Sequence, residues 1–334
     1  MKLLLVIDER TDPVVASGYI ARRFGARDAS VDVLGIIPGP GRDLAVPWSR
    51  VAPMTRHRAG LARSKEAVDD LAHATARELR ATHGLAVGTT HVRAGDPARV
   101  IAASGARLGS DLVLMRQPAG GFQARLRAVI LARSLLADTA CVVEFYAPAA
   151  ASGDGTLDVV VPLALEDIVQ YPVIRMCDFA WPASTRWRIL GIAREPAHPG
   201  RLESCVYRVL RAPHGAEAKR RAAQARLGTF CGELQRVLGA GAVIDHEIVT
   251  GTPGAVMADA RRQQPDALIV TLESPSQGFG RLSALTQERA LATSLRAAGS
   301  TLLLHGARGD AALRHWLSTS AMARARPAPG SRPV

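Results

Sequence analysis

Long apolar runs and cysteines are both scarce in this sequence. The apolar run at its start covers only residues 3–7 and is followed at once by Asp8, Glu9 and Arg10, whereas a signal peptide needs a longer apolar core and a cleavage site. No stretch approaches the roughly 18 consecutive apolar residues of a membrane span. The four cysteines have neither CxxC spacing nor histidine partners suited to zinc. We therefore expect a cytoplasmic protein with no metal site and no membrane partner.

Aromatic residues and lysine are scarce as well. Aromatics make up 4% of the 334 residues, so Val, Leu, Ile and Ala must fill the interior. Among the 42 basic residues only Lys2, Lys65 and Lys219 are lysines, and this bias, together with abundant Ala and Gly, is typical of a GC-rich genome. We expect a bacterial protein whose basic composition is partly a codon effect.

A net charge of +12 invites a nucleic-acid interpretation, but the charge is not concentrated. Residues 1–150 and residues 151–334 each carry a net charge of +6. DNA binding requires phosphate-neutralising side chains that cluster on one face, so nucleic acid is not the expected partner. With 48% hydrophobic and 22% charged residues, the composition is that of a globular protein.

Short apolar runs alternate with amphipathic stretches through the first part of the chain. The expected strands are residues 2–8, 31–37, 86–93, 111–115 and 140–146. The expected helices are residues 13–24, 61–82, 97–108 and 122–137. Strands that alternate with helices predict a parallel sheet covered on both faces.

The same order repeats after residues 148–156, a run of small residues that we interpret as a linker. The second set of expected strands is 157–161, 188–193, 243–249, 267–272 and 300–305, and it follows the first at a period of about 155 residues. The pattern predicts one domain over residues 1–147 and a second, divergent domain over 157–306. The Arg-, Ala- and Pro-rich tail, residues 317–334, is expected to be a disordered basic segment.

The segment from Gly95 to Tyr146 resembles the C-terminal half of universal stress protein domains. It reads GDPARVIAASGARLGSDLVLM, then a loop, then RAVILARSLLADTACVVEF, and the second part of the chain has GTPGAVMADARRQQPDALIVTL at the equivalent place. The resemblance implies an α/β fold class with two tandem five-stranded parallel-sheet domains. Each would be a Rossmann-like nucleotide-binding fold of the adenine nucleotide alpha hydrolase type.

ATP-binding members of that family carry Gly-x2-Gly-x9-Gly-Ser/Thr after the fourth strand, where glycines and a helix N-terminus hold phosphates. Counted without gaps from Met115, the four motif positions fall on Arg116, Ala119, Val129 and Ile130, and none matches. Val129 and Ile130 are thus expected to fill space that a phosphate site leaves open. The ATP-binding motif is therefore degenerate.

The resemblance also implies a vestigial nucleotide pocket. Asp8 ends the first strand, at the place of the family's adenosine-contacting aspartate, and Met115 and Arg116 end the fourth strand. The alternative interpretation is that the Asp8 carboxylate is solvated and supports the following turn. The second part of the chain has Pro162 and Leu163 at the corresponding place, and no aspartate.

The function implied is a non-enzymatic stress-response protein that binds a protein partner, with no cofactor and nucleotide binding lost or weakened. The alternative is an ATP- or AMP-binding stress protein with at most slow hydrolysis, and a basic nucleic-acid-associated protein is the third. No complete P-loop, GxGxxG, HExxH or GxSxG pattern is present. The last strands, 140–146 and 300–305, are expected to pair and make an internal pseudo-dimer, and a homodimer is the other assembly considered.

Overall fold

The structure, a computed structural model, is an α/β arrangement, as the sequence predicts, and its described strands form a single mostly parallel sheet. It describes residues 1–25, 29–38, 54–118, 122–138, 142–147, 156–165, 181–182, 184–193, 214–239, 241–273 and 300–305. We refer to residues 1–147 as the first half and residues 156–305 as the second half. The predicted linker and basic tail lie outside the described residues.

The described residues of the first half form nine elements in alternating order. They are β1 (Lys2–Ile7), α1 (Pro13–Phe24), β2 (Ser30–Pro38), α2 (Met54–Ala81), β3 (Ala86–Gly95), α3 (Pro97–Leu108), β4 (Leu112–Arg116), α4 (Phe122–Asp138) and β5 (Val142–Tyr146). The described elements of the second half are β6 (Asp158–Ala164), β7 (Arg186–Ala193), α7 (His214–Leu238), β8 (Val243–Thr250), α8 (Pro253–Gln263), β9 (Leu268–Glu273) and β10 (Thr301–His305).

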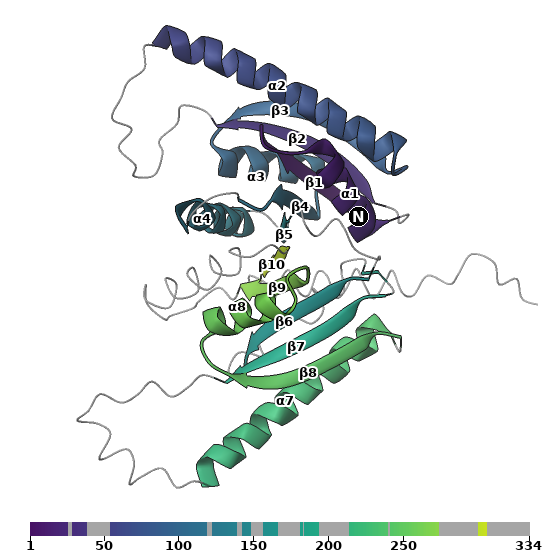
Figure 1. Cartoon of the computed structure of the whole chain (residues 1–334), viewed down its shortest axis with the longest axis vertical. Helices are drawn as coiled ribbons and strands as arrows, with labels where there is room; N and C mark the ends of the chain where they lie inside the picture. The colour runs from purple at the N-terminus through teal and green to yellow at the C-terminus, as the bar shows by residue number, and fades with distance from the viewer. Residues whose placement is uncertain are drawn as a thin grey trace, which may run out of the picture.

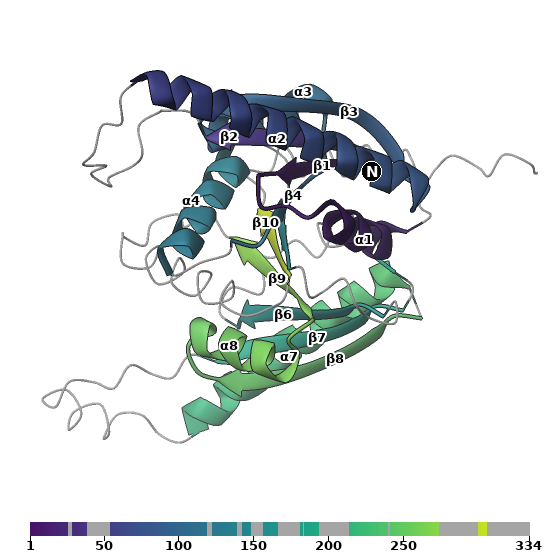
Figure 2. The ribbon, with the colours of Figure 1, turned by 45° about the horizontal axis from the view of Figure 1, so that its top comes forward.

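The ten strands form one sheet in the order β3-β2-β1-β4-β5-β10-β9-β6-β7-β8. Every neighbouring pair is parallel except β5 and β10, which pair antiparallel with Glu144 opposite Leu302. Read outward from this central pair, which we call the seam, both halves have the same strand order. The long helices α2 and α7 lie at opposite ends of the molecule (Figures 1 and 2). The sheet is therefore continuous through both halves.

Helices cover both faces of the sheet, and the core is divided accordingly. On one face, a single apolar cluster runs through both halves and includes Tyr19 of α1, Leu79 of α2 and Leu227 of α7. On the other face each half has its own cluster, with α3 and α4 packed on the first half and α8 on the second. The face bearing α1 is thus the one on which the two halves share a core.

Helices α3 and α8 begin in the same way, which explains the repeated Gly-x-Pro signal in the sequence. Gly95 and Gly251 both have φ of 152°, a conformation that favours glycine. The next residue is the N-cap in each half: Asp96 accepts a hydrogen bond from the N–H of Arg99 at 3.0 Å, and Thr252 accepts one from Ala255 at 3.3 Å.

A second pair of glycines allows the long helices to approach the sheet. Gly35 on β2 pairs with Ile7, and Gly191 on β7 pairs with Leu163, so the two glycines occupy equivalent places. A Cβ atom on Gly35 would lie 2.7 Å from Cγ1 of Val68 on α2. A Cβ atom on Gly191 would lie 3.0 Å from Cδ2 of Leu227 on α7 and 2.8 Å from Cδ2 of Leu165.

Candidate functional site

The carboxyl ends of β1 and β4 meet at one edge of the sheet, at the kind of position where open parallel sheets bind ligands. Asp8 directly follows β1, and its Oδ1 accepts hydrogen bonds from the N–H of Arg10 (3.1 Å) and from Oγ1 of Thr11 (2.9 Å). At the end of β4, the guanidinium of Arg116 donates to the carbonyl oxygen of Arg10. The structure therefore brings two predicted site residues together around the turn of residues 8–11.

Through these contacts the Asp8 carboxylate stabilises the turn that follows β1. This agrees with the interpretation that Asp8 supports the turn. Its contact with a nucleotide stays a prediction. The second half has no carboxylate at this place. Leu3 of β1 pairs with the first residue of β4, and Val159 of β6 pairs with the first residue of β9, so Val159 corresponds to Leu3. The residue equivalent to Asp8 is then Ala164, and the expectation of Pro162 and Leu163 at this place is wrong.

Met115, the third predicted site residue, is buried in the core. Its exposed fraction is 5%, and it belongs to the apolar cluster that includes Ile101 and Val129. Its side chain therefore packs between the sheet and helices α3 and α4.

The connection between β4 and α4 determines what a phosphate group would meet. Strand β4 ends at Arg116 and helix α4 begins at Phe122. A Gly-x2-Gly-x9-Gly-Ser/Thr loop is much longer than this connection. Val129 and Ile130 lie more than one turn inside α4, where backbone N–H groups bond to the carbonyl four residues earlier.

The expectation that Val129 and Ile130 fill a phosphate site is therefore wrong in its geometry. Val129 is fully buried in the core, and Ile130 is 40% exposed on the helix surface. The ungapped count from Met115 failed because it runs through a helix that starts well before the last two motif positions. The motif has no structural counterpart at these residues.

Tyr146 of β5 is a further residue at this edge, and the sequence analysis did not single it out. Its ring stacks on that of Tyr19, with centroids 5.2 Å apart. Its hydroxyl is buried and has no hydrogen-bond partner in the part of the chain that the structure describes. Burial raises the pKa of Tyr146, an effect opposed by the Arg116 guanidinium and reinforced by Asp8. Tyr146 thus lies between the Asp8 and Arg116 side chains at the carboxyl ends of the strands and the Tyr19 ring near the seam.

A buried polar cluster lies at the seam, where Glu144 on β5 has an exposed fraction of 0%. The hydroxyl of Tyr19 donates a hydrogen bond to Oε1 of Glu144, and Nε of Arg23 lies 3.8 Å from Oε2. The Arg23 guanidinium also stacks over the ring of Trp181 at 4.3 Å from its centroid. Burial raises the pKa of the Glu144 carboxyl, while Arg23 and the hydrogen bond from Tyr19 act in the opposite direction.

The second half contributes Arg261 and Ser300 to this cluster. The guanidinium of Arg261, on α8, is 2% exposed and donates to the carbonyl oxygens of Ala267 and Ser300, the latter at 2.9 Å. Burial lowers the pKa of Arg261 to about 10. The hydroxyl of Ser300 accepts a hydrogen bond from the N–H of Ala147 at 3.2 Å, across the seam. Arginines from α1 and α8 thus approach the seam from both halves.

Strand β8 carries three adjacent residues of types that can act as acids, bases or metal ligands. Asp245, His246 and Glu247 are exposed on β8, and Glu247 accepts a hydrogen bond from Nη2 of Arg188 at 2.6 Å. No group of three or more metal-ligating side chains occurs among the residues described. Within the same residues, no helix is long and apolar enough to cross a bilayer.

The solved structures that resemble this chain include a universal stress protein and a functionally unknown protein. A universal stress protein from Archaeoglobus fulgidus superposes with a TM-score of 0.51 at 12% identity, over 92% of this chain and 97% of the other. A functionally unknown protein from Pseudomonas aeruginosa has a TM-score of 0.51 at 13% identity, over 96% of this chain and 97% of the other. This likeness establishes the fold, a universal stress protein-like α/β arrangement. No protein-family model and no curated protein matches the sequence.

Proposed function

We propose that the chain is a tandem universal stress protein-like protein that acts without catalysis, by binding a protein partner, and that nucleotide binding is lost or weakened in its first half. The fold likeness supports the family, and the identical strand order of the two halves supports the tandem arrangement. A stress-response role follows from the family and is part of the proposal.

One observation carries the loss of nucleotide binding: the short connection between Arg116 and Phe122. Phosphate sites of this kind depend on several backbone N–H groups that converge on the anion, with a helix N-terminus behind them. A loop of this length offers a triphosphate fewer backbone N–H groups than the full motif would. The N–H groups of Val129 and Ile130 are used within α4, so they are not available to replace it.

The contacts of Arg116 support the same conclusion. A guanidinium can bind phosphate through two parallel hydrogen bonds and so compensate for a lost loop. Here the Arg116 guanidinium donates a hydrogen bond to the carbonyl oxygen of Arg10, and the Asp8 carboxylate accepts one from the N–H of Arg10. Both side chains stabilise the turn after β1. A nucleotide would have to compete with these contacts.

Calorimetric titration of the full chain with ATP tests the proposal. We expect no saturable binding below about 1 mM, which corresponds to roughly 4 kcal/mol of binding free energy at most. Native mass spectrometry of freshly purified protein should likewise show no retained nucleotide. Micromolar ATP binding that is lost in Asp8→Ala but kept in Glu66→Ala, an exposed acidic residue of α2, would establish the nucleotide-binding alternative instead.

A further inference from the structure

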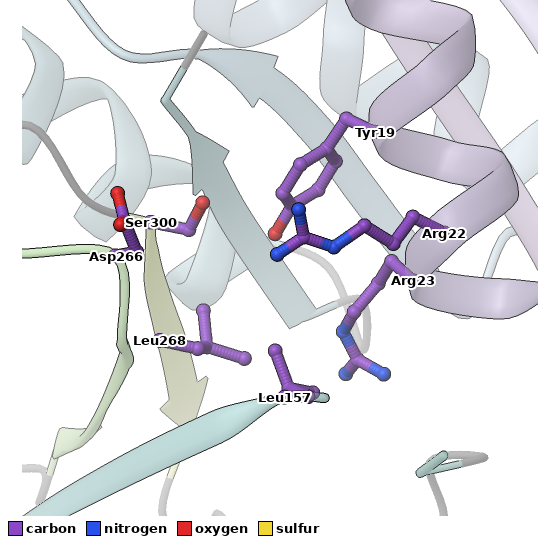
Figure 3. A pocket seen from close by; sticks show the side chains of 7 residues that line it. All are labelled: Tyr19, Arg22, Arg23, Leu157, Asp266, Leu268 and Ser300. Atoms are coloured by element: carbon purple, nitrogen blue, oxygen red, sulfur yellow. The ribbon is translucent and has the colours of Figure 1, made fainter. Parts of the chain in front are cut away.

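A small cavity lies beside the seam, between α1 and the second half. Its lining consists of Tyr19, Arg22, Arg23, Leu157, Asp266, Leu268 and Ser300. In Figure 3 the side chains of Arg22 and Arg23 leave α1 in different directions, Arg22 on the side of Tyr19 and Arg23 on the side of Leu157, and Leu157 and Leu268 supply apolar carbon to the lining. The enclosed space has room for about one or two water molecules. An organic ligand or a nucleotide does not fit such a space.

Arg22 carries a buried donor without an acceptor in this cavity. Its Nη1 atom has no hydrogen-bond partner in the part of the chain that the structure describes. A buried N–H donor that has lost water without gaining an acceptor costs about 1–3 kcal/mol, and more when the group is charged. A hydrogen-bond acceptor placed in the cavity would therefore be stabilised by the Arg22 N–H group.

The other polar groups of the cavity wall do not accept a hydrogen bond from Arg22 Nη1. The Tyr19 hydroxyl donates to Glu144 and also bonds to the Ser300 hydroxyl, and the Ser300 hydroxyl accepts from Ala147. Asp266, the acidic residue of the wall, is exposed, and Figure 3 shows its carboxylate on the far side of Ser300 from the Arg22 guanidinium.

The local charge is positive. Arg22 and Arg23 are adjacent on α1 and line the cavity, and Arg261 lies outside the lining, where the Asp266 carboxylate raises its pKa against the effect of burial. Against these three guanidiniums stand two carboxyl groups, Glu144 and Asp266. The net charge is positive by one even when both are ionised. The Arg23 guanidinium faces Glu144, so the charge that an anion in the cavity would chiefly meet is that of Arg22.

We propose that this cavity is a binding site for a single small anion, and that chloride is the ion it takes. A halide accepts hydrogen bonds from several directions and donates none, which suits a wall that offers N–H donors and apolar carbon. It occupies roughly the space of one water molecule, whereas tetrahedral oxyanions such as phosphate and sulfate are larger than the cavity. The proposal goes beyond the proposed function and does not depend on it.

Because the ion would sit between α1 of the first half and the β6 and β9 starts of the second, it would join the two halves. A ligand that binds only the folded state raises stability by mass action. At a chloride concentration about ten times the dissociation constant, the melting temperature should rise by roughly 3 °C.

The experiment compares thermal unfolding of the full chain in sodium chloride and in sodium gluconate at the same ionic strength, about 100 mM. Wild type and Arg127→Gln, an exposed arginine of α4, should both melt about 3 °C higher in chloride. Arg22→Gln should melt at the same temperature in both salts. Sodium sulfate at matched ionic strength should behave as gluconate does.

A second measurement reports binding directly and does not depend on stability. The ³⁵Cl NMR line of chloride broadens when the ion exchanges with a protein site, and bromide should narrow it by competition. We expect equal broadening with wild type and Arg127→Gln, and a marked loss with Arg22→Gln. Equal broadening by all three proteins, or equal melting temperatures of wild type in chloride and gluconate, would overturn the proposal.

Discussion

The hydroxyl of Tyr19, on α1, donates a hydrogen bond to the carboxyl of Glu144, on β5, although 125 positions separate the two residues in the sequence. Glu144 also stands opposite Leu302 in the antiparallel register of the seam. A buried carboxyl group therefore occupies the place where the two halves of the sheet join. Burying it without hydrogen bonds and a counter-charge would cost several kcal/mol, so Tyr19 and Arg23 are needed to hold it there.

Removing the Glu144 carboxyl should destabilise the protein strongly. Glu144→Ala leaves the Arg23 guanidinium, itself 3% exposed, without the carboxylate that it faces. The loss expected when one partner of a buried pair is removed is about 3–5 kcal/mol of unfolding free energy, measured by urea denaturation. Glu233→Ala, an exposed glutamate of α7, should change that energy by less than about 0.5 kcal/mol. A loss of less than about 1 kcal/mol in Glu144→Ala would show that the pair contributes little.

Stability should also depend on pH through Glu144. Burial raises the pKa of this carboxyl above its ordinary value of 4.5, so the folded protein binds the proton more tightly than the unfolded chain does. The resulting stabilisation is complete below pH 4.5 and is lost as pH rises through the higher folded-state pKa, by at most about 1.4 kcal/mol per pH unit. Wild type should therefore lose stability relative to Glu144→Gln as pH rises from about 4.5 upward.

Urea denaturation of both proteins across this range measures that difference. Burial and nearby arginines lower the pKa of His91, so His91 makes the protein more stable as pH rises, the opposite of Glu144. Because His91 is present in both proteins, its contribution cancels when the two are compared. If the unfolding free energy of wild type minus that of Glu144→Gln stays constant or rises with pH, the direction given for the Glu144 pKa is wrong.

The equivalent glycines of β2 and β7 should not tolerate a methyl group. In Gly35→Ala the new Cβ would lie 2.7 Å from Val68 of α2, and in Gly191→Ala it would lie 2.8 Å from Leu165. Such overpacking costs about 1–3 kcal/mol in each case. Gly228, inside α7, has no atom within 4 Å of an added Cβ, so Gly228→Ala should stabilise by about 0.5–1 kcal/mol. Thermal unfolding of the three variants gives the comparison, and equal effects at all three positions would contradict it.

The fold follows from local sequence signals to a large extent. Apolar runs such as residues 2–7 and 142–146 became parallel strands because helices cover both faces of the sheet and both faces are buried. The Gly-Asp-Pro and Gly-Thr-Pro segments correctly predicted the starts of α3 and α8, since a glycine with positive φ, a capping side chain and proline act within a few residues.

The candidate site was harder to predict from the sequence than the fold, because the residues that contact one another there are distant in the sequence. Nothing near Glu144 identifies Tyr19 or Arg23 as its partners. The signal that the sequence did contain was the charge itself, a glutamate inside the apolar run VVEFY, which a pattern of strand periodicity does not interpret. The phosphate motif was placed by counting from Met115, although the helix predicted from residue 122 already excluded that placement. A motif must fit the elements around it before its residues are given roles.

Dividing the chain should expose the seam. A fragment that ends near Gly153 keeps β1 to β5 but loses β10, so the outer edge of β5 presents unpaired N–H and C=O groups. Exposed strand edges pair with other chains, and this one also carries Glu144 and the face that Ser300 covers in the intact chain. We expect the fragment to dimerise or aggregate, and the full chain to remain monomeric at the same concentration because its two halves already pair. Size-exclusion chromatography with light scattering distinguishes the two cases. If the fragment is a stable, soluble monomer, the antiparallel pairing of β5 and β10 is not what keeps the chain from associating.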